Sequence, residues 1–252
     1  MPLDRLAQLK RAHDDAVMEG WDFSRLNGQM DADNPPWNFE ADCLAAMNTA
    51  PRIVDMGTGG AERLIALIED LDSADHIVVA TEGWEPNVQL ARRALEDLGV
   101  PVLFYDADQG EDMPFDDESV DLIMCRHEVY DASEIARVLA PGGIFLTQQV
   151  SGNDAPEIHD WFNCEFLYPE VTLERYEPDL VRAGLTIDLA ESWEGTMRFK
   201  DAEALVTYIG LVPWDAPDFT VEENASRLLE LDANPFTVTQ RRFRIYATKP
   251  AD

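Results

Sequence analysis

A glycine-rich turn follows a short apolar run near residue 53. The sequence reads Ile53-Val54-Asp55-Met56-Gly57-Thr58-Gly59-Gly60-Ala61, so an acid closes the run and glycines then turn the chain toward a helix. Glycine lets the backbone come close to a ligand, and amides exposed at a helix start can bind the ligand's carboxylate. A tight connection that binds nothing has the same pattern, so the turn needs its context.

Acids stand after the next two apolar runs of the chain. Glu82-Gly83 ends the second run, and Asp106-Ala107 ends the third. A carboxylate can accept both ribose hydroxyls of an adenosine, and another can accept the adenine amino group. Either acid has a simpler role, as a surface carboxylate favoured by a helix start or as a turn-forming aspartate. Beside the glycine turn, the two acids together fit one nucleoside ligand.

Titratable side chains also follow the fourth run. His127 ionises near neutral pH and could take a proton during a reaction, or it could bond to the loop backbone. Arg126 could hold a ligand or pair with one of many carboxylates. Gln148 and Gln149, after the fifth run, could orient a substrate or satisfy the local backbone. Aromatic side chains farther along could wall an acceptor pocket or pack in the core: Trp161, Trp193, Trp214 and Phe199.

Alternation of short apolar runs with helix-period segments from Arg52 onward predicts βαβ units and a parallel sheet. The carboxyl ends of parallel strands meet at one sheet edge, where open α/β sheets bind ligands. We expect strands at residues 53–56, 77–81, 102–105, 120–125, 144–150, 185–193 and 236–247. We expect helices at residues 88–98, 132–139, 154–162, 174–183, 201–211 and 221–231.

The amino-terminal segment has a different character. Leu3, Leu6, Leu9 and Val17 predict an amphipathic helix that ends near Gly20. An aromatic loop over residues 21–37, which includes Trp21 and Trp37, follows it. Residues 1–49 are therefore interpreted as a helix with an arm that covers a ligand.

The motifs together resemble the class I S-adenosylmethionine-dependent methyltransferases. The resemblance rests on residues 54–61, Glu82, Asp106-Ala107, and the stretches 113–123 and 137–143, and it covers about residues 50–150. Ala61 replaces a common third glycine, and the proline after Glu82 falls one position late. The resemblance implies a Rossmann-like, doubly wound, mostly parallel seven-stranded sheet, with residues 50–252 as the methyltransferase domain.

The same resemblance implies S-adenosyl-L-methionine as the cofactor and methyl transfer, which we expect to go to a small-molecule acceptor, with His127 as the candidate catalytic residue. The residues expected to bind the cofactor are Asp55, Gly57, Thr58, Gly59, Glu82, Gly83, Asp106, Ala107 and Arg126.

Other functions stay open at this point. A nicotinamide dinucleotide would suit the same architecture, but none of the six tyrosines has the lysine four positions later that short-chain dehydrogenases need. A module that binds the cofactor or its product without turnover would use the same acids. An RNA methyltransferase is a further alternative, through the basic cluster Arg241, Arg242 and Arg244.

The charge of the 252-residue chain bounds its partners. Fifty acids against 19 lysines and arginines give a net charge of −31. Such a field repels the phosphate backbone, so nucleic acid is disfavoured as a partner, and the composition suits a high-salt cytoplasm. Three scattered cysteines predict neither disulfides nor a metal site. No stretch has the roughly 20 apolar residues of a membrane span, so we expect a cytoplasmic monomer or homodimer.

Overall fold

The computed structural model describes residues 2–18, 22–73 and 75–251. Over these residues eight strands form a sheet in the order β1-β7-β8-β6-β5-β2-β3-β4. Their bounds are β1 Met30–Ala32, β2 Arg52–Met56, β3 Ile77–Glu82, β4 Val102–Phe104, β5 Val120–Arg126, β6 Leu139–Val150, β7 Thr186–Phe199 and β8 Phe236–Thr248. The α/β class is confirmed, whereas the expected count of seven strands is wrong. The additional strand, β1, has three residues, too few to show an alternating pattern.

The chain divides into two compact units. The first unit comprises Met1–Pro35, Ser151–Val171 and Trp193–Arg242, and the second comprises Pro36–Val150, Thr172–Ser192 and Phe243–Asp252. The long strands β7 and β8 each contribute residues to both units. The boundary expected near residue 50 therefore differs from the division of contacts, since residues 36–49 belong with the segment that carries the motifs.

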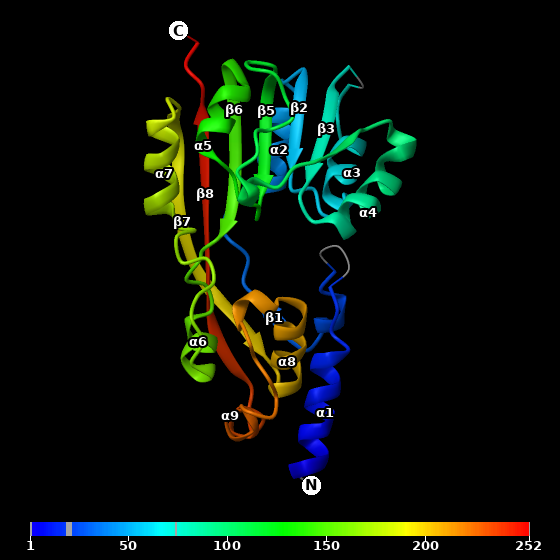
Figure 1. Cartoon of the computed structure of the whole chain (residues 1–252), viewed down its shortest axis with the longest axis vertical. Coiled ribbons are helices and arrows are strands. Elements are labelled where there is room, and N and C mark those ends of the chain that lie inside the picture. Colours follow the sequence, from blue (N-terminus) through cyan, green and yellow to red (C-terminus); the bar gives the residue numbers. More distant parts are fainter. Residues whose placement is uncertain (1, 19–21, 74, 252) are drawn as a thin grey trace. The chain divides into compact units, whose positions relative to one another are not determined.

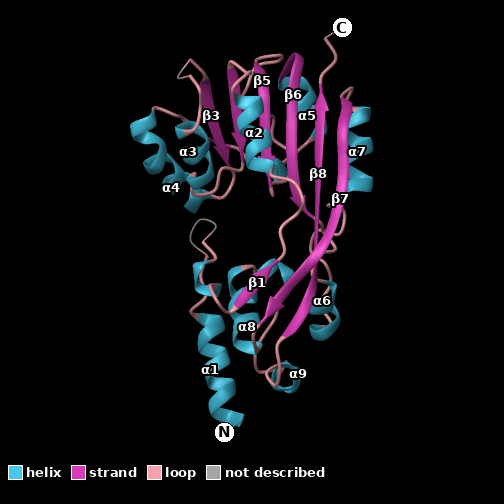
Figure 2. Ribbon diagram, turned by 180° about the vertical axis from the view of Figure 1, so that it is seen from behind, coloured by secondary structure: helices cyan, strands magenta, loops and turns pink. Residues whose placement is uncertain are grey.

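The second unit holds a parallel sheet whose strand ends are level. β2 pairs in parallel with β3 and β5, so Met56 lies opposite both Thr81 and Cys125. β4 pairs in parallel with β3, and β6 with β5. Figure 2 shows β8 running in the opposite direction to β6. The residues that follow β2, β3 and β5 consequently meet at one edge.

Helices cover both faces of this sheet, with α2 and α5 on opposite sides (Figures 1 and 2). The helices of the second unit are α2 Phe39–Met47, α3 Glu62–Glu69, α4 Glu85–Leu95, α5 Ala132–Val138 and α7 Leu173–Arg182. Its core joins buried residues of α2, β2, β5 and β6, among them Met47, Ile53, Leu122 and Leu146. The sequence analysis missed α2, which begins where the Asn38 side chain accepts a hydrogen bond from the Ala41 amide.

The sheet's fifth parallel strand begins earlier than expected. β6 starts at Leu139 and runs through Pro141-Gly142-Gly143, which lies between the helix expected to end at residue 139 and the strand expected to begin at residue 144. The Gly142 amide donates to the Lys249 carbonyl, and the Lys249 amide donates to the Gly143 carbonyl. Because both glycines make backbone hydrogen bonds, the proline and glycines do not end the strand.

The first unit packs around one buried helix. Its helices are α1 Pro2–Asp14, α6 Pro156–Phe162, α8 Ala202–Leu211 and α9 Ala225–Leu231. α8 contacts both α1 and α9. At Gly210 of α8 an added Cβ would lie 2.6 Å from the His13 carbonyl oxygen, so glycine permits a close approach of the chain.

The amino-terminal helix α1 is shorter than expected. It ends at Asp14, and Leu3 and Val17 are exposed whereas Leu9 is fully buried. The predicted end near Gly20 and the aromatic Trp21 lie outside the described residues. No helix in the described ranges is long and apolar enough to cross a membrane.

Candidate functional site

The glycine turn is held against the end of β3. The Gly57 and Thr58 amides both donate to the Thr81 carbonyl, at 3.0 Å each. Gly57 has a φ of +70°, a conformation that favours glycine. The Gly59 amide donates to Glu82. Each of these three amides has a partner within the protein, and the expectation that amides at the helix start bind a ligand's carboxylate stays a prediction.

Glu82 is a buried carboxylate with a fixed orientation. It is only 4% exposed, one oxygen accepts from the Gly59 amide at 2.7 Å, and the other accepts from the Trp84 amide at 2.9 Å. Burial raises the pKa of Glu82, while these backbone amides lower it. Each carboxylate oxygen has a second lone pair. The group can therefore still accept hydrogen bonds from two hydroxyls of a ligand.

The ends of β3 and β4 approach each other at Gly83. An added Cβ at this glycine would lie 2.9 Å from the Tyr105 carbonyl oxygen and 3.1 Å from the Asp106 Cα. Asp106 accepts from the Asp108 amide at 3.0 Å and from the Gln109 side chain at 2.8 Å. It thereby caps the short 3-10 helix Ala107–Gln109. Asp106 therefore forms the turn expected of it. Its Cα and Cβ lie beside Gly83, the residue that follows Glu82.

Asp55, at the end of β2, is half-buried beside this pair of acids. Burial raises the pKa of Asp55 to about 6; the nearby Thr58 side chain lowers it, and the nearby charge of Glu82 raises it further. Desolvation favours the neutral form of an acid, so the group carries less charge near pH 6 than a surface aspartate does.

Arg126, the last residue of β5, pairs with a carboxylate. Its guanidinium donates to Glu40 of α2, and Arg63 of α3 donates to the same carboxyl oxygen. Burial lowers the pKa of Arg126. Of the two roles considered from the sequence, the structure shows the ion pair, which also holds α2 and α3 near the end of β5.

His127 turns the chain sharply after β5. Its φ is +59°, which is uncommon for a residue other than glycine, and its amide donates to the Gln148 carbonyl at 2.9 Å. The Gln148 side chain accepts from Trp37 Nε1 at 2.6 Å, and its amide nitrogen lies 3.3 Å from His127 Nε2. Because the Gln148 oxygen serves Trp37, its NH₂ group donates to His127, and Nε2 must then carry a lone pair.

Glu128, the next residue, lies against the glycine turn. The sequence groups it with Arg126 and His127 as candidates after the fourth strand, without a separate role of its own. Its side chain is the nearest neighbour of the position where a Gly57 Cβ would be. Burial raises the pKa of Glu128 to about 8, and the charges of Glu82, Asp106 and Asp108 raise it further. The sequence signal for a role of Glu128 at the site is its position next to His127, two residues beyond the end of β5.

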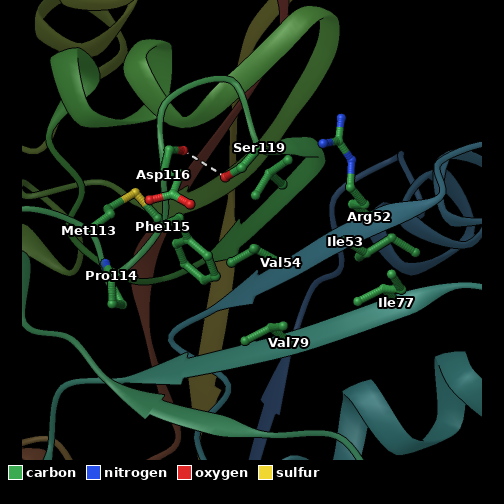
Figure 3. A pocket seen from close by; sticks show the side chains of 11 residues that line it. Arg52, Ile53, Val54, Ile77, Val79, Met113, Pro114, Phe115, Asp116 and Ser119 are labelled. Carbon is green, nitrogen blue, oxygen red and sulfur yellow. Dashed lines mark hydrogen bonds between the residues drawn. The ribbon is translucent and has the colours of Figure 1, made fainter.

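The cavity shown in Figure 3 lies elsewhere in the second unit. It measures about 540 Å³ and is lined by the first halves of β2 and β3 together with the loop from Met113 to Ser119. The Ser119 hydroxyl donates to the Asp116 carbonyl within this loop. None of the strand-end residues lines the cavity, so it is separate from the candidate site.

The remaining candidates have structural surroundings of their own. Gln149 donates to the Glu128 carbonyl at 2.9 Å and to Thr147 at 2.8 Å, so it satisfies local groups. In the first unit, Phe199 is 1% exposed and Trp161 packs edge-on against Phe236. Among the described residues no group of three or more His, Cys, Asp or Glu is placed to hold a metal ion.

Comparisons with known proteins match the segment that forms this edge of the sheet. Residues 53–143 match the family described as a methyltransferase domain. YcgJ of Bacillus subtilis (strain 168), an uncharacterized methyltransferase, is 24% identical over 119 residues, which are 44% of this chain and 46% of that protein. The matched segment thus spans about half the length of this curated relative.

Solved structures show the same fold. BH2331 of Bacillus halodurans C-125, a candidate methyltransferase, has a TM-score of 0.59 at 21% identity, with 84% of this chain and 97% of that chain covered. YcgJ has a TM-score of 0.58 at 16% identity, with coverages of 84% and 98%. A geranyl diphosphate methyltransferase in complex with S-adenosylmethionine has a TM-score of 0.51 at 14% identity, with coverages of 83% and 84%.

The matched segment contains β3, β4, β5 and most of β2, which are the strands whose ends meet at the candidate site. Residues 53–143 of this chain therefore match a methyltransferase domain by sequence, and the chain shares the fold of solved methyltransferase structures.

Proposed function

We propose that this protein transfers the methyl group of S-adenosylmethionine to a small-molecule acceptor. The observation that carries the proposal is Glu82, a buried carboxylate oriented by two backbone amides at the centre of the matched segment. A buried acid costs free energy unless it is paired. Two hydrogen bonds leave lone pairs on Glu82 that the ribose hydroxyls of an adenosine would use.

The described residues fit such a cofactor. Glu82 would hold the ribose, and Asp106 would accept from the adenine amino group. The Gly57 turn would let the backbone approach the remainder of the cofactor closely. When bound, S-adenosylmethionine supplies a methyl group that is already activated on a positively charged sulfur.

The protein's main contribution is then alignment, because the cofactor supplies the electrophile. A base is needed only where the acceptor loses a proton. His127 is the candidate base, and its Nε2 lies 3.3 Å from the side-chain amide of Gln148. Its Nε2 accepts from Gln148, so taking a proton on this nitrogen requires the Gln148 amide to move away.

The charges of the chain support a small acceptor. With a net charge of −31, the protein repels phosphate backbones. Each arginine of the basic cluster also pairs with an acid: Arg241 with Glu194, Arg242 with Asp154, and Arg244 with Asp42 and Glu191. Paired arginines displace few counterions from a nucleic acid, which weighs against an RNA substrate.

Calorimetric titration with S-adenosylmethionine and S-adenosylhomocysteine tests the cofactor. We expect saturable binding to the wild type, at low and high salt, and a loss of at least about tenfold in affinity in Glu82→Ala, because hydrogen bonds to a charged group each contribute about 1.5 to 3 kcal/mol. Glu69→Ala, at the exposed end of α3, is the matched control. Absence of binding to a folded wild type would contradict the proposal.

A binding module without turnover is the second candidate. The observation that favours it is the occupied Nε2 of His127. A screen of acceptors with labelled cofactor separates the two functions. Turnover that is lost in His127→Ala, while cofactor binding is kept, supports the enzyme; saturable binding with no product from any acceptor supports the module.

A further inference from the structure

The Glu128 side chain covers Gly57. A Cβ built on Gly57 would lie 2.6 Å from Glu128 Cβ, 2.7 Å from Cγ and 2.8 Å from Oε2. Real Cβ atoms essentially never lie within 3.0 Å of another heavy atom outside their own residue and its neighbours, so only glycine at position 57 leaves room for this acid in its present place. The carboxylate thus lies directly on the turn that the family match makes part of the cofactor site.

The backbone around Glu128 is built to keep it there. His127 adopts its left-handed conformation immediately before Glu128, and such strain persists only where the surrounding structure enforces it. The Glu128 carbonyl accepts from the Cys125 thiol at 3.2 Å and from Gln149 Nε2 at 2.9 Å. Gln149 is 3% exposed and also donates to Thr147 at 2.8 Å. Buried hydrogen bonds therefore hold the turn that carries the acid.

The order of the strands relates this acid to parts of the cofactor. Along the edge the strands follow as β4, β3, β2 and β5. The adenine would bind at Asp106 after β4 and the ribose at Glu82 after β3. In the cofactor the sulfur is attached to the ribose through one carbon. The next place along the edge is the β2 turn at Gly57, where Glu128 arrives from β5.

We propose that Glu128 recognises the positive charge of the sulfonium and so makes the site prefer the charged methyl donor to its neutral product. This inference rests on the proposed function. The carboxylate attracts a cation and gains nothing comparable from the uncharged thioether of S-adenosylhomocysteine. Methyl transfer converts the sulfonium to an uncharged thioether. The same site would therefore bind the donor tightly and the product weakly, without any change in its other contacts.

A proton accompanies this recognition. Burial raises the pKa of Glu128 to about 8, so at neutral pH the free protein holds this acid mostly protonated. A sulfonium beside it favours the ionised form, and binding of the donor releases a proton that product release restores. The charges of Glu82, Asp106 and Asp108 act on Glu128. The other titratable groups at these strand ends are Asp55, Arg126 and His127. The two ligands differ in charge only at the sulfur, so any other group would distinguish them only if it faced the sulfur.

The experiment compares affinities for S-adenosylmethionine and S-adenosylhomocysteine by calorimetry from about pH 6.5 to 8.5, in two buffers of different ionisation enthalpy. Both ligands carry the same amino and carboxyl groups, so the ratio of their dissociation constants isolates the sulfonium. In the wild type we expect the preference for the donor to rise about tenfold over this range, with more protons released by the donor than by the product.

Glu128→Gln keeps the shape of the protonated acid and should fold as the wild type does near neutral pH. We expect it to bind the donor about tenfold more weakly at pH 8.5, to bind the product within about twofold of the wild type, and to lose the pH dependence of the ratio. Glu111→Gln, an exposed glutamate of the same unit, removes the same charge and should match the wild type. Glu128→Asp, which keeps the charge on a shorter side chain, should retain part of the preference.

Two results overturn the inference. Equal weakening of both ligands in Glu128→Gln assigns the acid to a group they share, such as the ammonium, and unchanged ratios in both Glu128 variants remove it from recognition. Failure of the wild type to bind either ligand is a different result, because it contradicts the proposed function itself.

Discussion

At the scale of single residues, several described acids hold protons unusually tightly, and three of them titrate near neutral pH. Burial raises the pKa of Asp55 to about 6, of Asp215 to about 7 and of Glu128 to about 8. Asp215, in the first unit, also accepts a hydrogen bond from Tyr208 at 2.5 Å, which lowers its pKa. In an unfolded chain such acids have pKa values near 4. Between about pH 5 and 8 these three acids therefore bind more protons in the folded protein than in the unfolded chain.

This difference predicts how stability depends on pH. Where the folded state binds more protons, the free energy of unfolding falls as pH rises. The contribution of Glu128 is present below its unfolded pKa and is lost as the pH rises through about 8. We expect the thermal midpoint to fall between about pH 5 and 9, and Glu128→Gln to fall less steeply than the wild type. Melting curves at constant ionic strength measure this, and parallel profiles for the two proteins would contradict it.

Gly57 offers a second test at this scale. Gly57→Ala places a methyl group where Glu128 lies, and it does so at a φ of +70°. We expect a loss of about 1 to 3 kcal/mol in the free energy of unfolding and weakened cofactor binding, measured by urea unfolding and calorimetry. Gly110→Ala is the matched control, since Gly110 has a φ of +67° with nothing within 4 Å of the added Cβ. Equal effects in the two variants would show that strain alone matters and that Glu128 is not displaced.

At the scale of elements, Arg244 connects two long strands to α2. From β8 its guanidinium lies 4.8 Å from the centre of the Trp37 ring and 5.1 Å from that of Tyr246. It pairs with Glu191 of β7 and with Asp42 of α2. Its side chain is only 14% exposed. The arginine that the sequence analysis grouped with a basic surface is thus an internal connection of the second unit.

Removing this connection should be costly. We expect Arg244→Met to lower the free energy of unfolding by about 1 to 3 kcal/mol, because the largely buried guanidinium loses its hydrogen bonds to two half-exposed acids. Arg182→Met removes an exposed arginine paired with Asp179 on α7, and it should cost less than about 1 kcal/mol. Urea unfolding compares the two variants. A similar, small effect for both would mean that Arg244 is as weakly coupled as a surface ion pair.

The elements also show what the sequence could and could not predict. Apolar runs such as residues 53–56 and 120–125 predicted β2 and β5 because these strands are buried on both faces. The sequence analysis expected Gly57 and Glu82 at the same edge of the sheet because parallel strands end together, and the structure confirms the parallel pairing. β1 and α2 were missed, since β1 has three residues and α2 begins from a single capping asparagine. Glu128 was missed as a contact of Gly57 because that contact depends on the left-handed backbone at His127, which no pattern of residue types indicates.

At the scale of the whole molecule, the net charge of −31 opposes compaction. Salt shortens the range of this repulsion from about 10 Å at 0.1 M to about 3 Å at 1 M. We expect the thermal midpoint to rise by several degrees between about 0.1 and 2 M sodium chloride, because acids greatly outnumber bases and repulsion outweighs the exposed ion pairs that salt also weakens. Glycerol at matched osmolality controls for water activity. A midpoint that falls with salt would mean that the ion pairs dominate instead.

The hydrogen bonds of Arg5 with Asp232 join residues 227 positions apart, and this separation has a consequence for synthesis. β2 to β6 can pair in sequence as the ribosome delivers them, whereas α1 cannot reach its final partner until residue 232 has emerged. At roughly 5 to 20 residues per second, that wait lasts on the order of 10 to 40 s. During this time the fully buried Leu9 is without its final neighbours. The nascent amino terminus is therefore the part of this chain that we expect a chaperone to meet first.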